Sequence, residues 1–324
     1  MRVFLTVDID VYYSGDFDLE ARGYGKGVDH IIAVANDHGV PVTFFVDIMG
    51  ATRWGVKPVR ELCRYIQSEG HEVQMHLHPV VAQIDNFTDQ QDTFWREDLA
   101  TQTRLIRIGM EMFDACGVEN VVAFRAGALA ANVDSLRAMQ ANNLYMSSNR
   151  DLDQKSSIAS QLNDHFAVRN DAAAWEGIVD LPVNVLRSPI PWADGPYRHL
   201  EICALGSLEM KDALRRMAGA GYAAATILTH PREFFYRTRS GTAYIQKNCR
   251  RLESLIRLLG NDSRLSACPI SAWKRDDALP MVSPPELRLH PLHSLMRLIG
   301  QIEYRVRRKF FLNPQPFDPV KVEA

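Results

Sequence analysis

Residues 70–79 read GHEVQMHLHP, a glycine followed by a largely apolar run that ends in two histidines. The run predicts a strand over residues 72–78, and residues two apart on a strand point to the same face. His76 and His78 therefore share a face at the end of that strand. Imidazole binds zinc and neighbouring transition metals, so the pair is a candidate metal site. The alternative is a hydrogen-bonded pair with a purely structural role.

Segments with strand and helix periodicity alternate on both sides of this stretch. The apolar run VTFFV, residues 42–46, is typical of a strand buried in a parallel sheet. Further strands are predicted at residues 3–7, 121–124, 144–146, 178–183, 223–228 and near 265, and helices at 28–38, 59–69, 94–116, 133–141, 207–220 and 243–259. About seven strands alternating with helices indicate a parallel sheet, closed or doubly wound. The polar residues 149–175 are predicted to run over the surface.

Composition and charge limit the function classes. The 324 residues include 37 Lys and Arg against 39 Asp and Glu, so no overall field favours nucleic acid as a partner. The five cysteines are scattered and form no CxxC pair, which is typical of a reducing compartment. No secretion signal and no apolar run long enough to span a membrane is recognisable. We therefore expect a cytoplasmic protein, which could also bind peripherally to the inner face of the membrane.

The C-terminal part differs in character from the rest. We expect a barrel domain over residues 1–278 and an extension over residues 279–324, which begins with a proline-rich linker. Residues 292–311 place apolar side chains at helical spacing among several arginines, which predicts a basic amphipathic helix. We favour packing of its apolar side on the domain or on a second subunit. The alternative is contact with an anionic membrane surface.

Other polar residues of interest also stand at the ends of predicted strands. Asp8 and Asp10 share a face, and two adjacent carboxylates repel unless a cation lies between them or one is protonated. Arg125 and His230 end two further strands, and Asp8 is the natural partner for a buried arginine. Because parallel α/β folds place their sites at the carboxyl ends of strands, we expect these residues to meet on one rim. Loop capping, a surface ion pair and a core histidine remain the structural alternatives.

Taken in order, these motifs resemble those of the polysaccharide deacetylases of carbohydrate esterase family four, the NodB-homology group. TVDID, residues 6–10, is similar to the family's TFDD motif with one residue inserted, and residues 38–46 resemble its second strand. GHEVQMHLHP resembles its metal-histidine motif, shortened from HxxxH to HxH, while FRAG and LTHP match the motifs of the arginine and the acid histidine. The resemblance covers residues 1 to about 235. The family's tryptophan-bearing motif is not evident.

The resemblance implies a distorted (β/α)7 barrel of the NodB-homology type with a C-terminal amphipathic helical extension. It also implies roles for the site residues: the metal ligands Asp10, His76 and His78, the base Asp8 with its partner Arg125, and the acid His230. Asp180, near the expected place of the missing motif, is the candidate to orient His230. The expected cofactor is one divalent metal, Zn²⁺ first, with Co²⁺, Mn²⁺ or Ni²⁺ as alternatives.

The implied activity is metal-dependent removal of an N-acetyl or other N-acyl group from an amino sugar. In a cytoplasmic protein, we expect the substrate to be a nucleotide- or lipid-linked intermediate of surface-glycan biosynthesis. Two alternatives stay open on the same fold: hydrolysis of a non-sugar amide or cyclic amide, and a catalytically inactive carbohydrate-binding barrel. A metal-free serine hydrolase comes last, because the sequence has no G-x-S-x-G.

Overall fold

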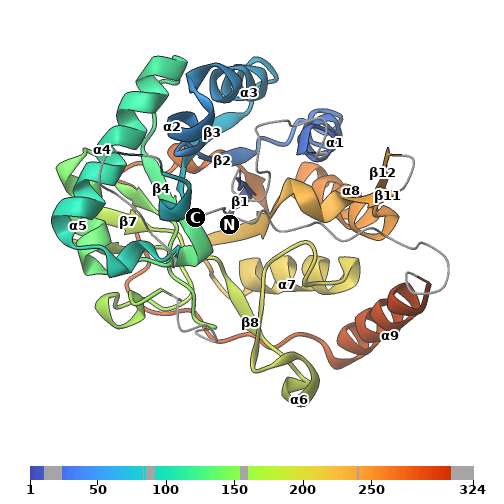
Figure 1. The fold of residues 1–324 in the computed structure, drawn as a ribbon. Helices are drawn as coiled ribbons and strands as arrows, with labels where there is room; N and C mark the ends of the chain where they lie inside the picture. The colour runs from blue at the N-terminus through green and yellow to red at the C-terminus, as the bar shows by residue number, and fades with distance from the viewer. Residues whose placement is uncertain (11–23, 83, 85–91, 154–159, 239–240, 308–324) are drawn as a thin grey trace.

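A curled, mainly parallel sheet forms the centre of the protein (Figure 1). The computed structural model describes residues 1–10, 24–82, 84, 92–153, 160–238 and 241–307. The strands of the central sheet are β1 (Arg2–Ile9), β2 (Thr43–Asp47), β3 (Glu72–Leu77), β4 (Ala123–Ala126), β5 (Met146–Ser147), β6 (Ala173–Trp175), β7 (Ile178–Asp180), β10 (Ala224–Thr229) and β13 (Ser266–Ala267). Their order is β10-β1-β2-β3-β4-β5-β7-β6, with β13 paired to β1.

The two ends of this sheet approach each other. Neighbouring strands pair in parallel except β6, which is antiparallel to β7. A parallel bridge between Val183 and Thr226 links the segment after β7 to β10. The sheet is therefore a barrel whose closure between β7 and β10 is irregular. This confirms the predicted distorted (β/α) barrel.

Helices surround the sheet on its outer side (Figure 1). They are α1 (Tyr24–Asn36), α2 (Gly50–Trp54), α3 (Val56–Ser68), α4 (Leu99–Cys116), α5 (Val133–Ala141), α7 (Ser207–Gly219) and α8 (Gln246–Asn261). The sequence had not indicated the short helix α6 (Pro191–Asp194), the hairpin of β8 (Val185–Arg187) with β9 (Tyr197–His199), or the hairpin of β11 (Phe235–Thr238) with β12 (Gly241–Tyr244). These elements are only three or four residues long, too short for a periodic pattern.

Alternation along the strands sorts side chains between the outer helices and the barrel interior. On β1, Val3, Leu5 and Val7 belong to the core under the helices, whereas Phe4 belongs to a second cluster inside the barrel. Successive strand residues point to opposite faces, so Asp8 shares the inner side with Phe4. The interior is thus apolar toward the start of β1 and polar toward its carboxyl end.

Helix α4 begins later than its apolar pattern predicts. The sequence indicates a helix from residue 94, but α4 starts at Leu99, because the Asp98 carboxylate caps it by accepting a hydrogen bond from the Thr101 N–H at 2.8 Å. Residues 94–96 form a separate short 3-10 helix. At the other end the helix stops before Gly117, whose φ of 76° favours glycine.

The prediction that residues 149–175 run over the surface is wrong for much of the segment that the structure describes. Arg150 is 1% exposed, and Asp171 is fully buried. The Arg150 guanidinium donates to the Asp180 carboxylate at 2.7 Å and to the carbonyls of Val168 and Asp171 at 2.6 Å. A buried ion pair thus anchors a polar segment, whose composition alone suggested exposure.

The C-terminal helix α9 (Pro291–Arg307) packs on α7 through polar side chains. Ser294 donates to Glu209 at 2.6 Å, and Arg297 forms an ion pair with the same carboxylate at 2.9 Å. Its apolar residues Leu292, Leu295, Met296 and Ile299 are 52–58% exposed, so these side chains do not pack on the domain, and packing on a second subunit stays a prediction. Residues 308–311 of the predicted helix lie outside the described residues. Within the described part of the chain, no helix is long and apolar enough to cross a membrane.

Removing the buried guanidinium that anchors residues 149–175 should destabilise the protein. Arg150→Ala leaves the Asp180 carboxylate buried with its charge uncompensated, and we expect the free energy of unfolding to fall by about 3–5 kcal/mol. Urea unfolding followed by circular dichroism measures this. The control is Arg137→Ala, which removes an exposed ion pair with Asp134 and should cost no more than about 1 kcal/mol. Equal losses in the two variants would contradict the anchoring role.

Candidate metal centre

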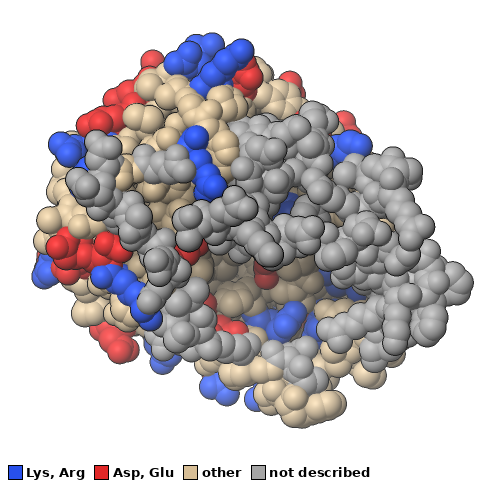
Figure 2. All heavy atoms as spheres, in the orientation of Figure 1, with Lys and Arg blue, Asp and Glu red and all other residues tan. Residues whose placement is uncertain are grey.

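The strand ends of the barrel bring the predicted site residues to one cavity of about 390 Å³. The face seen in Figure 2 is hollowed near its centre, and acidic and basic side chains are visible within the hollow. Of the six predicted site residues, five line the cavity: Asp8, Asp10, His76, His78 and His230. Arg125 is fully buried beneath them. The expectation that these residues meet on one rim agrees with this arrangement.

Asp10, His76 and His78 lie close enough to share one ion. The Asp10 Oδ1 atom is 3.1 Å from His76 Nε2 and 3.5 Å from His78 Nε2. One ligand atom from each residue lies within 4.8 Å of the others, and all three side chains are buried. His78 follows the end of β3, yet its ring stays beside that of His76, with centroids 4.8 Å apart and planes at 83°. The HxH spacing therefore still brings both imidazoles to the carboxylate.

The second nitrogen of each imidazole has a fixed partner. His76 Nδ1 lies 2.8 Å from the Arg125 carbonyl oxygen, and His78 Nδ1 lies 2.5 Å from Asp92 Oδ2. A carbonyl oxygen and a carboxylate can only accept, so both Nδ1 atoms carry the proton. In the neutral imidazole, the Nε2 lone pair then points to the Asp10 side, as metal-binding histidines require.

Asp10 is a buried carboxylate with positively charged neighbours. Burial alone would raise the pKa of its carboxyl, but His230 and the other cationic neighbours hold that pKa well below its usual range. His230 Nε2 is 3.8 Å from Asp10 Oδ2, and Arg232 contacts the same oxygen. A buried carboxylate with two imidazole Nε2 atoms fits a borderline metal such as zinc.

Asp8 is held by the buried Arg125. The Arg125 Nη1 atom donates to Asp8 Oδ1 at 2.5 Å and to Thr6 Oγ1 at 3.0 Å. The Nε atom of Arg125 donates to the Ser148 carbonyl oxygen at 3.2 Å, and its Nη2 atom donates to the Ser148 hydroxyl at 2.8 Å. The guanidinium also lies 4.2 Å from the Phe45 ring centroid. The Asp8 carboxylate is thus kept in one orientation at the cavity wall.

Glu233 orients His230. We had expected Asp180 to do so, and that expectation is wrong. His230 Nδ1 is 2.8 Å from Glu233 Oε1, and Thr229 Oγ1 donates to the other carboxylate oxygen at 2.7 Å. Burial disfavours protonation of His230, but Asp10 and Glu233 outweigh it and raise the pKa of the imidazole to about 8. Asp180 instead binds Arg150 and Ser147.

Several residues of the cavity were missed by the sequence analysis. They are Asp92, Asp151, His199, Glu201 and Arg232, to which Glu233 is added as the partner of His230. Arg232 directly follows Pro231 of LTHP and Glu233 comes next, so their position close to His230 in the sequence was a usable signal. Asp92 and His199 stand in segments without periodicity, and nothing in the local sequence separates them from ordinary loop residues.

Comparisons with known proteins support the fold. No family model and no curated protein matches the sequence. A protein from Mycobacterium smegmatis described as a polysaccharide deacetylase shares 18% identity over 84% of this chain and 87% of that chain, with a TM-score of 0.54. Puue allantoinase shares 11% identity over 84% of this chain and 88% of its own, with a TM-score of 0.52. A family 4 carbohydrate esterase from Streptomyces lividans, solved in complex with acetate, shares 12% identity over 83% of this chain and 91% of its own, with a TM-score of 0.42.

The fold of the chain is therefore the one that polysaccharide deacetylases and an allantoinase share, as the sequence motifs had suggested. At these identities the likeness concerns the fold. The chemistry of the cavity depends on its own residues.

Gly127 allows a direct test of the histidine geometry. A methyl group at Gly127 would overlap the His78 ring, so Gly127→Ala should displace this imidazole and lower zinc affinity by about 10–100-fold. Competition titration with a chromogenic chelator measures the affinity. Gly219→Ala, on the exposed side of α7 with nothing within 4 Å, serves as the control and should bind zinc like the parent. Unchanged affinity in Gly127→Ala would argue against His78 as a ligand.

Proposed function

We propose that the protein is a metal-dependent hydrolase that removes an N-acetyl or related N-acyl group from an amino sugar. One observation carries the proposal: the candidate ligands share a cavity with a carboxylate fixed by arginine and with a histidine fixed by glutamate. The fold shared with polysaccharide deacetylases supports the same reaction class.

The cation would be held by Asp10, His76 and His78. When bound, a divalent metal supplies Lewis acidity, which polarises an amide carbonyl and lowers the pKa of water at the site. Zn²⁺ suits two imidazoles and one carboxylate best, with Co²⁺, Mn²⁺ or Ni²⁺ as alternatives. Asp92 and the Arg125 carbonyl hold the two rings in position for this role.

Asp8 acts as the general base in this proposal. It lines the cavity, and the Arg125 guanidinium holds its carboxylate in one orientation, from which it can accept a proton from the attacking water. A positioned base of this kind contributes about 10²–10⁴-fold to the rate.

His230 acts as the general acid. An amine leaves poorly unless it is protonated, and the imidazole with its raised pKa is protonated at neutral pH. Its Nδ1–H is engaged by Glu233, so the proton for the leaving amine comes from Nε2, on the side of the ring that faces Asp10.

Substitutions at Asp8 and Asp10 separate the roles of base and ligand. Asp8→Asn preserves shape and should lower acetate release by about 10²–10⁴-fold while retaining the metal. Asp10→Ala and His76→Ala should lose both the metal and the activity. Elemental analysis and an acetate assay give the two readouts. Metal retained in both ligand variants would contradict the proposed centre, and an active Asp8→Asn would contradict the base.

The cavity lining favours a polar substrate such as a sugar. Asp151, His199, Glu201 and Arg232 offer donors and acceptors around the proposed centre, which suits hydroxyl groups. We propose an acetylated amino sugar from a biosynthetic path to a surface glycan, carried on a nucleotide or a lipid. The exposed apolar residues of α9 are compatible with a protein that works in the cytoplasm at the inner face of the membrane.

The second candidate function is hydrolysis of a non-sugar amide or cyclic amide, which the structural similarity to Puue allantoinase supports. We expect the zinc-loaded protein to release acetate from N-acetylated amino sugars and to leave hydantoins, imides and ureides intact. Turnover of both panels is followed by chromatography, with Asp8→Asn as the blank. Turnover of the ureide panel alone would replace the deacetylase proposal, and no turnover of either would favour an inactive carbohydrate-binding barrel.

A further inference from the structure

Glu201 lies beside Glu233, the carboxylate that orients the candidate acid His230. The chain around Glu201 runs along β10: Glu201 forms a parallel bridge with Leu228, and the Ile202 N–H donates to the Leu228 carbonyl at 3.3 Å. Leu228 is two residues before His230, so this bridge brings Glu201 to the candidate acid. The proposed function uses Glu201 only as part of the polar lining of the cavity.

The side chains of Glu201 and Glu233 are in hydrogen-bonding contact, although ionised carboxylates can only accept. One ligand atom from each of Glu201, His230 and Glu233 lies within 4.8 Å of the others. Glu233 Oε1 is 2.8 Å from His230 Nδ1, and Glu233 Oε2 accepts from Thr229 Oγ1 at 2.7 Å. Because two adjacent carboxylates repel, the contact requires a proton on one of the two glutamates or a cation between them.

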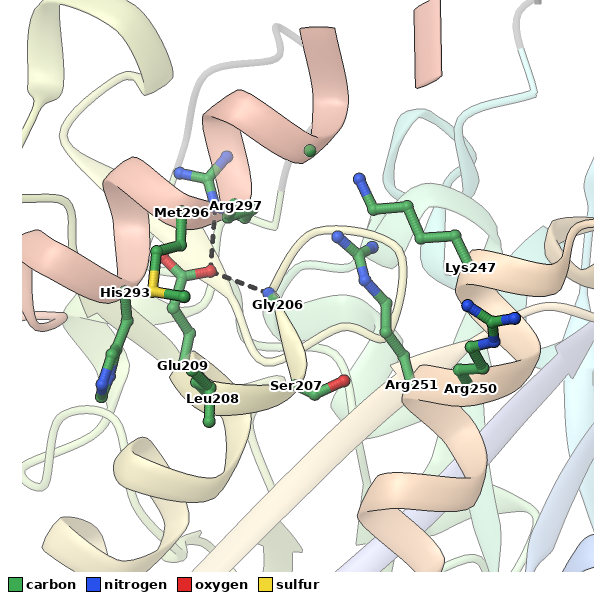
Figure 3. Close-up of a pocket in the computed structure, with 11 residues that line it drawn as sticks. Gly206, Ser207, Leu208, Glu209, Lys247, Arg250, Arg251, His293, Met296 and Arg297 are labelled. Atoms are coloured by element: carbon green, nitrogen blue, oxygen red, sulfur yellow. Dashed lines mark hydrogen bonds and ion pairs between the residues drawn. The ribbon is translucent and has the colours of Figure 1, made fainter. Parts of the chain in front are cut away.

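Glu209, which lines a separate cavity between α7, α8 and α9, shows the more usual surroundings of a buried glutamate (Figure 3). In Figure 3 dashed lines join its Oε2 atom to the Gly206 N–H at 2.8 Å and to the Arg297 guanidinium at 2.9 Å. Its Oε1 atom accepts from the Ser294 hydroxyl at 2.6 Å. All three partners are donors. Glu201 differs, because one of its contacts is a second carboxylate.

The charges around the pair favour a proton on Glu201 rather than on Glu233. Burial and the Glu233 carboxylate raise the pKa of Glu201, against the opposing effect of His230 and His199. Burial would also raise the pKa of Glu233, but the hydrogen bond and the charge of His230 lower it. The Cys203 thiol contacts both carboxylates, and burial together with these carboxylates raises the pKa of Cys203, so the thiol is a neutral neighbour.

We propose that Glu201 is a positioning residue for the acid: it is protonated at neutral pH and donates a hydrogen bond to Glu233, which in turn holds the His230 ring. The two glutamates then carry one negative charge, which matches the one positive charge of the imidazolium. Donors from Thr229, His230 and Glu201 fix the Glu233 carboxylate, and the direction of His230 Nε2 is fixed with it. The effect on turnover rests on the proposed function, whereas the protonation of Glu201 does not.

Infrared spectroscopy of the full-length protein with isotopically labelled glutamate carboxyl groups tests the proton directly. At neutral pH the parent should show the carbonyl stretch of a protonated glutamate, and Glu201→Gln should lack it. Glu119→Gln, an exposed substitution before β4, changes the net charge equally and should retain the band. The assignment is wrong if the parent lacks the band or if Glu201→Gln keeps it.

Zinc content, measured on the same samples, separates a shared proton from a shared cation. The parent and Glu201→Gln should hold the same amount of zinc, because a proton and not a metal lies between the two carboxylates. An additional zinc ion per chain in the parent, lost in Glu201→Gln, would replace the shared proton by a cation and overturn the proposal.

Turnover distinguishes positioning from contact with the substrate. Glu201→Leu removes the donor to Glu233 and should lower kcat for acetate release about tenfold, while Glu201→Gln restores a neutral donor and should recover most of that loss. A loss confined to KM would identify Glu201 as a substrate contact, and an unchanged kcat in Glu201→Leu would remove any positioning role. If the parent turns over no acetylated sugar, the proposed function fails, and the infrared band still decides the protonation of Glu201.

Discussion

The Asp10 carboxylate is the charge around which the cavity is built. Its Oδ1 atom lies beside the imidazoles of His76 and His78, and its Oδ2 atom beside His230 and Arg232. These partners come from β3 and from the segment after β10, so one carboxylate connects three strand ends. A buried anion is tolerated only when positive charge and donors surround it, which explains why the polar residues of the barrel interior gather here.

Arg125 provides the second connection across the barrel interior. Its guanidinium joins β1, through Asp8 and Thr6, to Ser148 directly after β5, and its backbone carbonyl positions His76. The residue that fixes the candidate base therefore also fixes a candidate metal ligand. Loss of this side chain would release Asp8, whereas the backbone carbonyl that accepts from His76 would remain, so the two contacts are separable.

Much of the fold was predictable because the strands are buried and the helices amphipathic. Period-two and helical patterns located the main elements, and parallel topology then implied that Asp8, Asp10, His76 and His230 meet at one end of the sheet. The residues that hydrogen-bond to the site side chains and orient them were not predictable in the same way. Asp92 reaches His78 from a loop, and the pairing of Asp180 with Arg150 rather than His230 depends on how a long irregular segment folds back into the barrel. Such contacts have no local sequence period.

The short HxH spacing has a consequence for how the proposed centre would take up an ion. His76 is part of β3 and His78 follows it directly, so no intervening loop has to close around the cation. Both rings are already anchored through their Nδ1 atoms, and the conformational entropy of arranging them is lost during folding, before any metal arrives. A cation that binds here, as proposed, would meet ligands that are already in place and would need no unfolding of the chain to enter. Which metal such a site holds would then depend on supply as well as on ligand chemistry.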